Sequence, residues 1–252
     1  MNSTERRLKI YDILVDKETV DVGELSATFN VSAMTIRRDL AIFENQGLIT
    51  TTYGGAYMNN KISDTNGTTP TLAIDDDVRL IGKAACRRLS HGERIFLEAG
   101  AISSGLIYGL KFLRLTVMTN SLLAANVLRS FSNIKLIMMP GDYDKETSGF
   151  LSSSTISFMR NYNFEAAILN GIFMDTSAGL TADTEIEAHL KATAVTCASR
   201  SMILLKSESI GKIGFAQAVN PQKLECIVTD NGITPEQAAA FEKRGISVVV
   251  GE

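Results

Sequence analysis

Apolar positions follow two different patterns along the chain, and the pattern changes near residue 70. In the first 57 residues they recur at three- and four-residue spacings, which predicts short helices. Beyond about residue 71, short apolar runs alternate with amphipathic stretches, which predicts strands separated by helices. Residues 58–70 are polar and carry glycine and proline, so they predict a linker. The chain is therefore expected to hold two domains, residues 1–57 and residues 71–252.

The first domain is expected to contain three helices followed by a hairpin. Leu8 and Leu14 belong to the apolar stripe of the first helix. Asp21 and Ser32 are good N-caps for the second and third helices. Residues 48–53 are β-branched and aromatic and precede two glycines, which predicts a hairpin. This order of elements is typical of a winged helix-turn-helix.

The outward face of the third helix carries the candidate DNA contacts. Ile36, Leu40 and Phe43 share one apolar face, and at about 100° per residue Arg38 lies nearly opposite Ile36. The amide end of a helix favours phosphate, and arginine can bond guanine with two parallel hydrogen bonds. Adjacent arginines are more often a solvated face, and such a unit could also dock a protein. The candidate DNA-binding residues are Ser32, Met34, Thr35, Arg37 and Arg38 on the helix and Tyr53, Gly54 and Gly55 in the hairpin.

Charge and composition limit the other readings. The 252 residues are 45% hydrophobic and carry a net charge of −3, so bulk basicity does not argue for DNA binding. The three cysteines have no metal-ligand spacing, and we expect free thiols, no metal and no cofactor. The start lacks an apolar signal segment, and no run of about 18 apolar residues occurs. A cytoplasmic protein without a membrane span is therefore expected.

The second domain is expected to be α/β with a mostly parallel sheet. Its helices are expected at 75–89, 120–131, 184–199 and 235–244. Helices alternating with strands cover both faces of such a sheet. The expected strands are Ile95–Leu97, Leu115–Thr119, Ile134–Met139, Ala166–Leu169, Met202–Leu205, Ile227–Val228 and Ile246–Val250.

Ligands of open α/β sheets bind at the carboxyl ends of strands, which singles out three loops. Glycine lets backbone N–H groups approach an anion, and hydroxyl groups can donate to phosphate oxygens. Strand-to-helix turns need glycine, serine and asparagine for structural reasons as well. The candidate effector-binding residues of these loops are Glu98, Gly100, Ser103, Ser104, Thr119, Asn120, Ser121 and Gly141.

Residues 20–56 resemble the DNA-binding domain of the DeoR family of sugar-metabolism regulators. The resemblance rests on Glu24-Leu25, Phe29, Val31-Ser32, Thr35-Ile36-Arg37-Arg38-Asp39-Leu40, Glu44, Gly47-Leu48 and Gly54-Gly55-Ala56. It implies that Ser32 through Arg38 form the recognition helix. The family's wing carries an arginine and a histidine before the glycines, where this chain has Thr50-Thr51-Thr52-Tyr53. Fewer wing cations predict a smaller phosphate contribution to DNA affinity.

Residues from about 75 to 252 resemble the sensor domain of the same family, whose fold is similar to ribose-5-phosphate isomerase. The matching pieces are Leu115-Thr116-Val117, Thr119-Asn120-Ser121, Gly171-Ile172, Gly179-Leu180-Thr181, Glu187 with Lys191, and Thr229-Asp230. The resemblance implies a phosphorylated sugar or related effector, and Glu187 and Lys191 join the candidate effector-binding residues.

The sensor resemblance departs from the family pattern at two places. The first loop usually reads Asp-x-Gly-Thr-Thr, whereas here Glu98 and Gly100 are followed by Ala101 and Ile102. The later Leu-Leu-Ala-Asp-x-x-Lys-Phe-Gly corresponds to 204–211, with the acid replaced by a lysine and the lysine by a serine. Lys206 and Lys212 could restore a cation nearby.

The sequence therefore predicts a repressor of a carbohydrate operon, controlled by a phosphorylated sugar or polyol. Its expected partners are operator DNA, that effector and further copies of itself, as a dimer or tetramer built through residues beyond 70. Two alternatives stay open: a sugar-phosphate isomerase-like enzyme with an accessory DNA-binding domain, and a DNA binder without a ligand.

Overall fold

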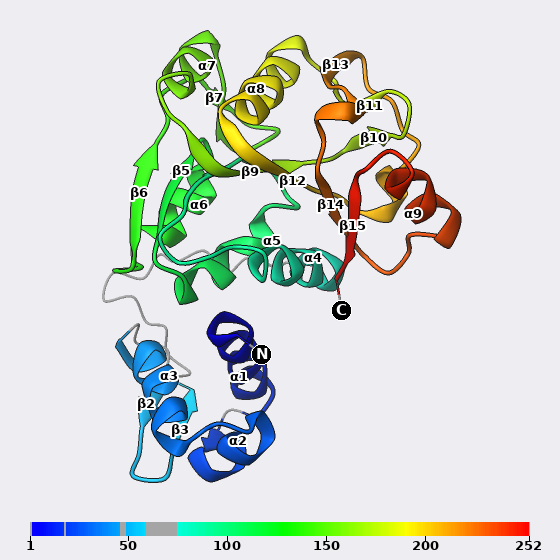
Figure 1. The fold of residues 1–252 in the computed structure, drawn as a ribbon. Coiled ribbons are helices and arrows are strands. Elements are labelled where there is room, and N and C mark those ends of the chain that lie inside the picture. The colour runs from blue at the N-terminus through cyan, green and yellow to red at the C-terminus, as the bar shows by residue number, and fades with distance from the viewer. Residues whose placement is uncertain (1, 18, 46–48, 59–74, 252) are drawn as a thin grey trace. The chain divides into compact units, whose positions relative to one another are not determined.

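The computed structural model describes residues 2–17, 19–45, 49–58 and 75–251, and these form two compact units, Met1–Thr71 and Leu72–Glu252. Beyond Met58, the linker predicted for residues 58–70 lies outside the described residues, as does Gly47. Figure 1 shows the elements of both units.

The first unit is a helix-turn-helix with a small sheet. Its elements are α1 (Ser3–Lys17), β1 (Thr19–Asp21), α2 (Val22–Phe29), α3 (Ala33–Asn45), β2 (Ile49–Thr51) and β3 (Gly55–Met58). The predicted hairpin is present as β2 and β3. The sequence did not predict β1, which pairs with β3 to give the strand order β1-β3-β2. A three-residue strand is too short to show the alternation that marks a strand.

Both predicted N-caps of this unit are present. The Asp21 carboxylate accepts hydrogen bonds from the backbone N–H groups of Gly23 and Glu24, at 2.7 and 3.0 Å. The Ser32 hydroxyl accepts one from the Thr35 N–H at 3.2 Å. These bonds satisfy N–H groups that have no partner within the first turn of a helix. Between α2 and α3, Asn30 adopts φ 50° and ψ 50°, which turns the chain in the left-handed conformation that asparagine tolerates.

The second unit is built on a seven-stranded parallel sheet, which confirms the predicted fold class. Its strand order is β15-β14-β12-β9-β4-β5-β6. The strands are β4 (Arg94–Leu97), β5 (Leu115–Thr119), β6 (Ile134–Met138), β9 (Phe164–Asn170), β12 (Ala198–Leu204), β14 (Cys226–Thr229) and β15 (Ser247–Val250). Each corresponds to one predicted apolar run. Central runs such as Ile95–Leu97 are buried throughout, because helices cover both faces of the sheet.

Helices lie on both faces of this sheet (Figure 1). One face carries α4 (Asp76–Cys86), α5 (Ser104–Ile107) and α6 (Leu122–Leu128), and the other carries α7 (Ser153–Met159), α8 (Glu185–Thr196) and α9 (Pro235–Glu242). The four predicted helices are α4, α6, α8 and α9, each somewhat shorter than predicted. The sequence missed α7, because its polar first turn hides the apolar spacing of Ile156 and Met159.

The remaining elements are short and lie around the main sheet. They are β7 (Tyr143–Asp144), β8 (Gly149–Phe150), β10 (Phe173–Asp175), β11 (Gly179–Ala182), β13 (Ala216–Val219) and the 3₁₀ turns η1 (Tyr108–Phe112), η2 (Ser207–Ser209) and η3 (Pro221–Lys223). Strands β10, β11 and β13 form an antiparallel sheet, and β7 pairs with β8. None of these short strands was predicted, and they supply loops that border the cavity described below.

Candidate functional site

The N-terminal half of α3 presents a polar and cationic surface. Met34 is 55% exposed, and Arg37 and Arg38 are both exposed. Among the described residues neither arginine makes an ion pair, so both guanidinium groups are available to a partner. Ile36 is fully buried on the opposite side. The helix therefore faces the way that the spacing of its apolar residues predicts.

A buried ion cluster fixes α3 against α1, and the sequence analysis did not find it. Asp39 is 1% exposed and accepts hydrogen bonds from Arg6 Nε at 2.6 Å and Arg7 Nε at 2.7 Å. One carboxylate thus holds two guanidinium groups of the first helix. The sequence did indicate that Asp39 is buried, because it lies three residues after Ile36 and therefore on the apolar face of α3. Arg6 and Arg7 are thus bound to Asp39, whereas Arg37 and Arg38 are the exposed cations of α3.

The hairpin places its three candidate residues in different environments. Tyr53 is fully exposed at its tip, and Gly54 is exposed beside it. Gly55 is buried, and a Cβ there would lie 2.0 Å from the carbonyl oxygen of Val20. Gly55 is therefore required by the pairing of β1 with β3, whatever else it contacts.

A hydrogen-bonded acid ties the hairpin to α3. Glu44 Oε1 accepts from the backbone N–H of Thr51 at 2.9 Å and from its hydroxyl at 2.5 Å. The Thr51 hydroxyl and N–H lower the pKa of the Glu44 carboxyl. The wing of this chain thus carries threonines that bond to the protein itself, where the family pattern has cations.

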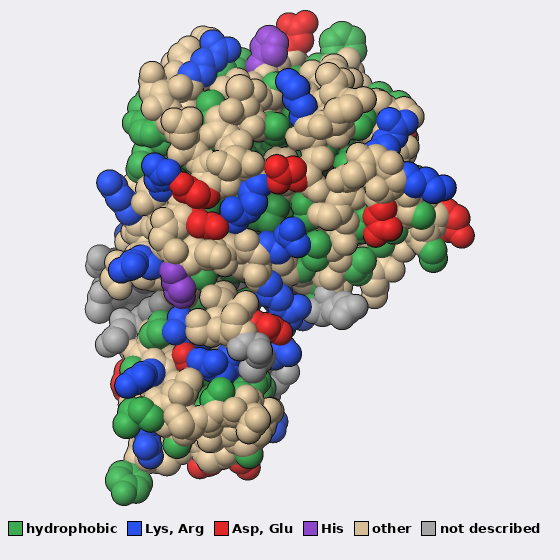
Figure 2. Space-filling view, in the orientation of Figure 1, with side chains coloured by type: hydrophobic (Ala, Val, Ile, Leu, Met, Phe, Trp, Pro, Cys, Tyr) green, Lys and Arg blue, Asp and Glu red, His purple; other side chains and the backbone are tan. Residues whose placement is uncertain are grey.

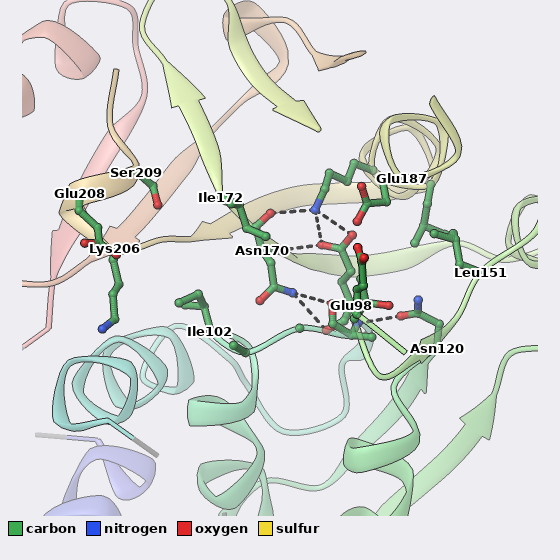
Figure 3. Close-up of a pocket in the computed structure, with 18 residues that line it drawn as sticks. Glu98, Ile102, Asn120, Leu151, Asn170, Ile172, Glu187, Lys206, Glu208 and Ser209 are labelled. Carbon is green, nitrogen blue, oxygen red and sulfur yellow. Dashed lines mark hydrogen bonds and ion pairs between the residues drawn. The ribbon is translucent and has the colours of Figure 1, made fainter. Parts of the chain in front are cut away.

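A cavity of about 260 Å³ lies at the carboxyl ends of strands β12, β9, β4 and β5 (Figure 3). Because neighbouring parallel strands end at the same edge, loops far apart in sequence meet there. Of the candidate effector-binding residues, the structure brings five to this cavity: Glu98, Gly100, Asn120, Glu187 and Lys191. A second cavity of about 530 Å³ adjoins it and shares the loop Gly100–Ile102, while Ser104 and Ser121 line only this second cavity.

A buried cluster of Glu98, Lys191 and Asn170 forms one wall of the first cavity. Lys191 Nζ lies 2.8 Å from each carboxylate oxygen of Glu98 and 2.8 Å from the carbonyl oxygen of Asn170. The Asn170 N–H donates to Glu98 at 2.8 Å. Both charged side chains are more than nine-tenths buried. All three ammonium protons of Lys191 have acceptors, and the Glu98 carboxylate neutralises its charge. Lys191 lies at the cavity, and its role in binding an effector stays a prediction.

Asn170 was not predicted, although it organises the first loop. Its amide oxygen accepts from the Ser103 N–H at 2.9 Å, and its amide nitrogen donates to the Ala99 carbonyl at 3.0 Å. Gly100 adopts φ +152°, and a Cβ there would lie 2.6 Å from the Asn170 amide carbon. Glycine at this position therefore allows the loop to close on Asn170.

All four hydroxyl groups proposed for the effector bond to the protein, including that of Ser104, which donates to the Ala101 carbonyl. The hydroxyl of Ser103 donates to the Glu98 carbonyl at 2.6 Å, and that of Thr119 donates to the Leu97 carbonyl at 2.7 Å. The hydroxyl of Ser121 caps α6. Ser103, Thr119 and Gly141 line neither of the two cavities. These residues shape the loops, and their identities follow from the turns that they form.

The described part of the chain offers no cluster of three or more histidine, cysteine, aspartate or glutamate side chains that could hold a metal ion. The three cysteines are free, and burial raises the pKa of the Cys86 thiol to about 12. Within the same residues, no helix is long and apolar enough to cross a membrane.

A helix-turn-helix with an exposed cationic face, followed by an α/β domain with a cavity at its strand ends, is typical of a DNA-binding regulator with a sensor domain. Residues 6–62 match the model of the DeoR-like helix-turn-helix domain, and residues 76–231 match that of the DeoR C terminal sensor domain. The chain belongs to the DeoR family. It is a transcriptional regulator and not an enzyme, so the isomerase alternative is wrong.

Relatives match the chain over nearly its whole length. It is 28% identical to a putative aga operon transcriptional repressor of Escherichia coli O157:H7, covering 99% of this chain and 95% of that one. It is 26% identical to the HTH-type transcriptional repressor GlcR of Bacillus subtilis, covering 100% and 98%. It is 27% identical to a lactose phosphotransferase system repressor of Lactococcus lactis, covering 96% and 97%.

Solved structures of ribose 5-phosphate isomerase A share a more distant likeness of fold. The Methanocaldococcus jannaschii isomerase aligns over 54% of each chain, with 14% identity and a TM-score of 0.39. The Neisseria gonorrhoeae isomerase aligns over 54% of this chain and 53% of its own, with 8% identity and a TM-score of 0.38. Likeness at this level says nothing about activity.

Proposed function

We propose that the protein is a cytoplasmic repressor of a carbohydrate operon that binds operator DNA through α3. The proposal rests on Arg37 and Arg38, which are exposed and make no ion pair among the described residues. Asp39, on the buried side of the same helix, accepts hydrogen bonds from two arginines of α1. The names of the relatives support the sign of regulation, since two are repressors and a third is a putative repressor. The lactose phosphotransferase system repressor supports the class of genes. Ser32, Met34, Thr35, Tyr53 and Gly54 complete the proposed DNA-binding surface.

DNA binding by this surface calls for more than one copy of the chain. On the face drawn in Figure 2, the Lys and Arg side chains of the larger unit are interspersed with Asp and Glu. That face therefore has no broad basic area over the larger unit. One recognition helix with few phosphate cations makes a small interface, and two-fold pairing doubles it. The proposed assembly is a dimer or tetramer formed through residues beyond 70.

Arg38→Ala is expected to lower affinity for an operator selected from random DNA by about tenfold or more. A bidentate contact to a base is worth roughly 1–3 kcal/mol, and its loss relaxes specificity at that base pair. Because Arg38 is exposed, the melting temperature should stay unchanged. Fluorescence anisotropy at fixed salt measures the affinity, and Lys135→Ala, an exposed cation of the larger unit, is the control. Unchanged binding of the Arg38→Ala variant would exclude α3 as the reading helix.

The effector is proposed to be a phosphorylated sugar or polyol bound in the cavity at the strand ends. The cavity supplies carboxylates for sugar hydroxyl groups, including Glu187. The backbone N–H groups of Gly100, Ala101 and Ile102 have no acceptor among the described residues, which suits an anion. Ser104 and Ser121 border the adjoining cavity. Ser103, Thr119 and Gly141 would act by shaping these loops.

A further inference from the structure

Only two cations line the two cavities among the residues that the structure describes, Lys191 and Lys206. The two lysines differ in the partners to which their ammonium groups are already bonded. Lys191 is buried and bonded to both oxygens of Glu98 and to the Asn170 carbonyl. Moving it toward a ligand would leave the buried Glu98 carboxylate without its cation, which is costly in a protein interior. Lys191 is therefore poorly suited to bind an incoming anion directly.

Lys206 is held much more weakly. It follows β12, and its side chain is 25% exposed. Its ammonium group bonds to one carboxylate oxygen of Asp75, whose side chain is 51% exposed. The Asp75 carboxylate raises the pKa of Lys206, and the Lys206 ammonium lowers that of Asp75. Pairs that are open to solvent in this way contribute little to stability, so a second anion can compete for the lysine.

Lys206 also lies where an anion bound in the cavities could contact it. It lines both cavities, as does the loop Gly100–Ile102 with its available N–H groups. Figure 3 shows Lys206 and the Glu98 cluster on different sides of the pocket, with Ile102 between them. The acids Glu98 and Glu187 lie on the Lys191 side, and Glu208 lies beside Lys206. Of the two lysines, Lys206 is the one whose bonded carboxylate is exposed, so its side of the pocket is the better suited to exchange that carboxylate for another anion.

We propose that Lys206 binds the phosphate of the effector and that Asp75 is the internal carboxylate which the phosphate displaces. This inference rests on the proposed phosphorylated effector and adds the residue that recognises its charge. The phosphate is assigned to Lys206, at a position where the family sequence pattern has no lysine, and not to Lys191. Asp75 competes with the phosphate for the Lys206 ammonium group, so it lowers the phosphate affinity without contacting the ligand.

Two substitutions and their combination test the exchange. Lys206→Met removes the charge and keeps most of the side-chain length. Asp75→Asn removes the competing charge, and asparagine caps a helix about as well as aspartate, so α4 keeps its N-cap bond to the Asp77 N–H. Lys212→Met is the matched control, because Lys212 is exposed in the same loop and lines neither cavity.

The probe is inorganic phosphate at pH 8, with sodium chloride of equal ionic strength as reference and the melting temperature of the full chain as readout. Phosphate should stabilise the unmodified protein. Lys206→Met should weaken phosphate binding about tenfold, as expected for loss of a charge-assisted contact. Asp75→Asn should strengthen it roughly two- to fivefold, the worth of an exposed ion pair, and Lys206→Met should abolish that gain. Lys212→Met should bind as the unmodified protein does.

The other outcomes are also decisive. If phosphate binds Lys206→Met as tightly as the unmodified chain, the assignment to Lys206 is wrong while a phosphorylated effector remains possible. If Asp75→Asn gives no gain although Lys206→Met loses affinity, the displacement is wrong. If neither phosphate nor any member of a panel of sugar phosphates changes the melting temperature of the unmodified chain, the proposed effector class falls together with this inference.

Discussion

Lys191→Met should destabilise the sensor unit by about 3–5 kcal/mol, the usual cost of removing one partner from a buried ion pair. The substitution leaves the Glu98 carboxylate 4% exposed with one N–H donor and no cation. Because the chain has no tryptophan, circular dichroism during urea unfolding is the suitable measurement. The transition of the larger unit should move to clearly lower urea concentration.

Two further variants separate the loss of charge pairing from the loss of a side chain. Glu98→Gln combined with Lys191→Met removes both charges and keeps an acceptor for the Asn170 N–H, so it should recover a large part of the lost stability. Lys206→Met breaks an exposed pair and should change stability by less than about 1 kcal/mol. Equal urea midpoints for Lys191→Met and Lys206→Met would show that the Glu98–Lys191 pair has no structural role.

Asp39→Asn should destabilise the DNA-binding unit by about 3 kcal/mol or more, because two guanidinium groups lose the carboxylate between them. A unit this small has little stability to spare, so α1 and α3 should separate and operator binding should be lost. Hydrogen exchange is the direct readout. Backbone amides of α1 and α3 should lose protection, while those of the seven-stranded sheet keep it.

Asp21→Asn is the matched control for this experiment. Asp21 is exposed in the same unit and caps α2, a role in which asparagine replaces aspartate with little loss. It should leave exchange and operator affinity nearly unchanged. Native protection of α3 in Asp39→Asn would mean that the apolar face of α3 alone holds the helix, and the proposed anchoring of the recognition surface would be wrong.

The architecture was predictable because it depends on apolar periodicity. The seven predicted runs are the seven strands of the parallel sheet, and Ile36 faces inward as its spacing with Leu40 and Phe43 requires. Several of the shortest elements were missed, since strands of two or three residues such as β1, β7 and β8 are too short to repeat a pattern. The position of β1 depends on its partner β3, which is distant in the sequence, whereas β7 and β8 pair with each other across a short turn.

The sequence predicted which loops form the site but not which hydrogen bonds and ion pairs are made there. Strand ends identified the Glu98–Ile102 loop and Asn120, because parallel topology alone brings them together. The pairing of Glu98 with Lys191 spans 93 positions, and that of Lys206 with Asp75 spans 131. A single sequence contains no signal for such contacts. Hydroxyl groups such as those of Ser103 and Thr119 serve turns and ligands alike, and only the structure shows that they bond to backbone carbonyls.

Coupling of operator binding to a phosphorylated effector within one chain is tested most directly by calorimetry with the full chain. The sugar phosphate that most raises the melting temperature in a panel is titrated into the protein alone and into the protein–operator complex. We expect its affinity to differ between the two by several-fold and the operator affinity to change by the same factor when it is bound. The unphosphorylated parent sugar should bind at least about tenfold more weakly. Equal affinities with and without operator would mean that the protein binds DNA without control by this ligand, which is the opposite of the proposed coupling.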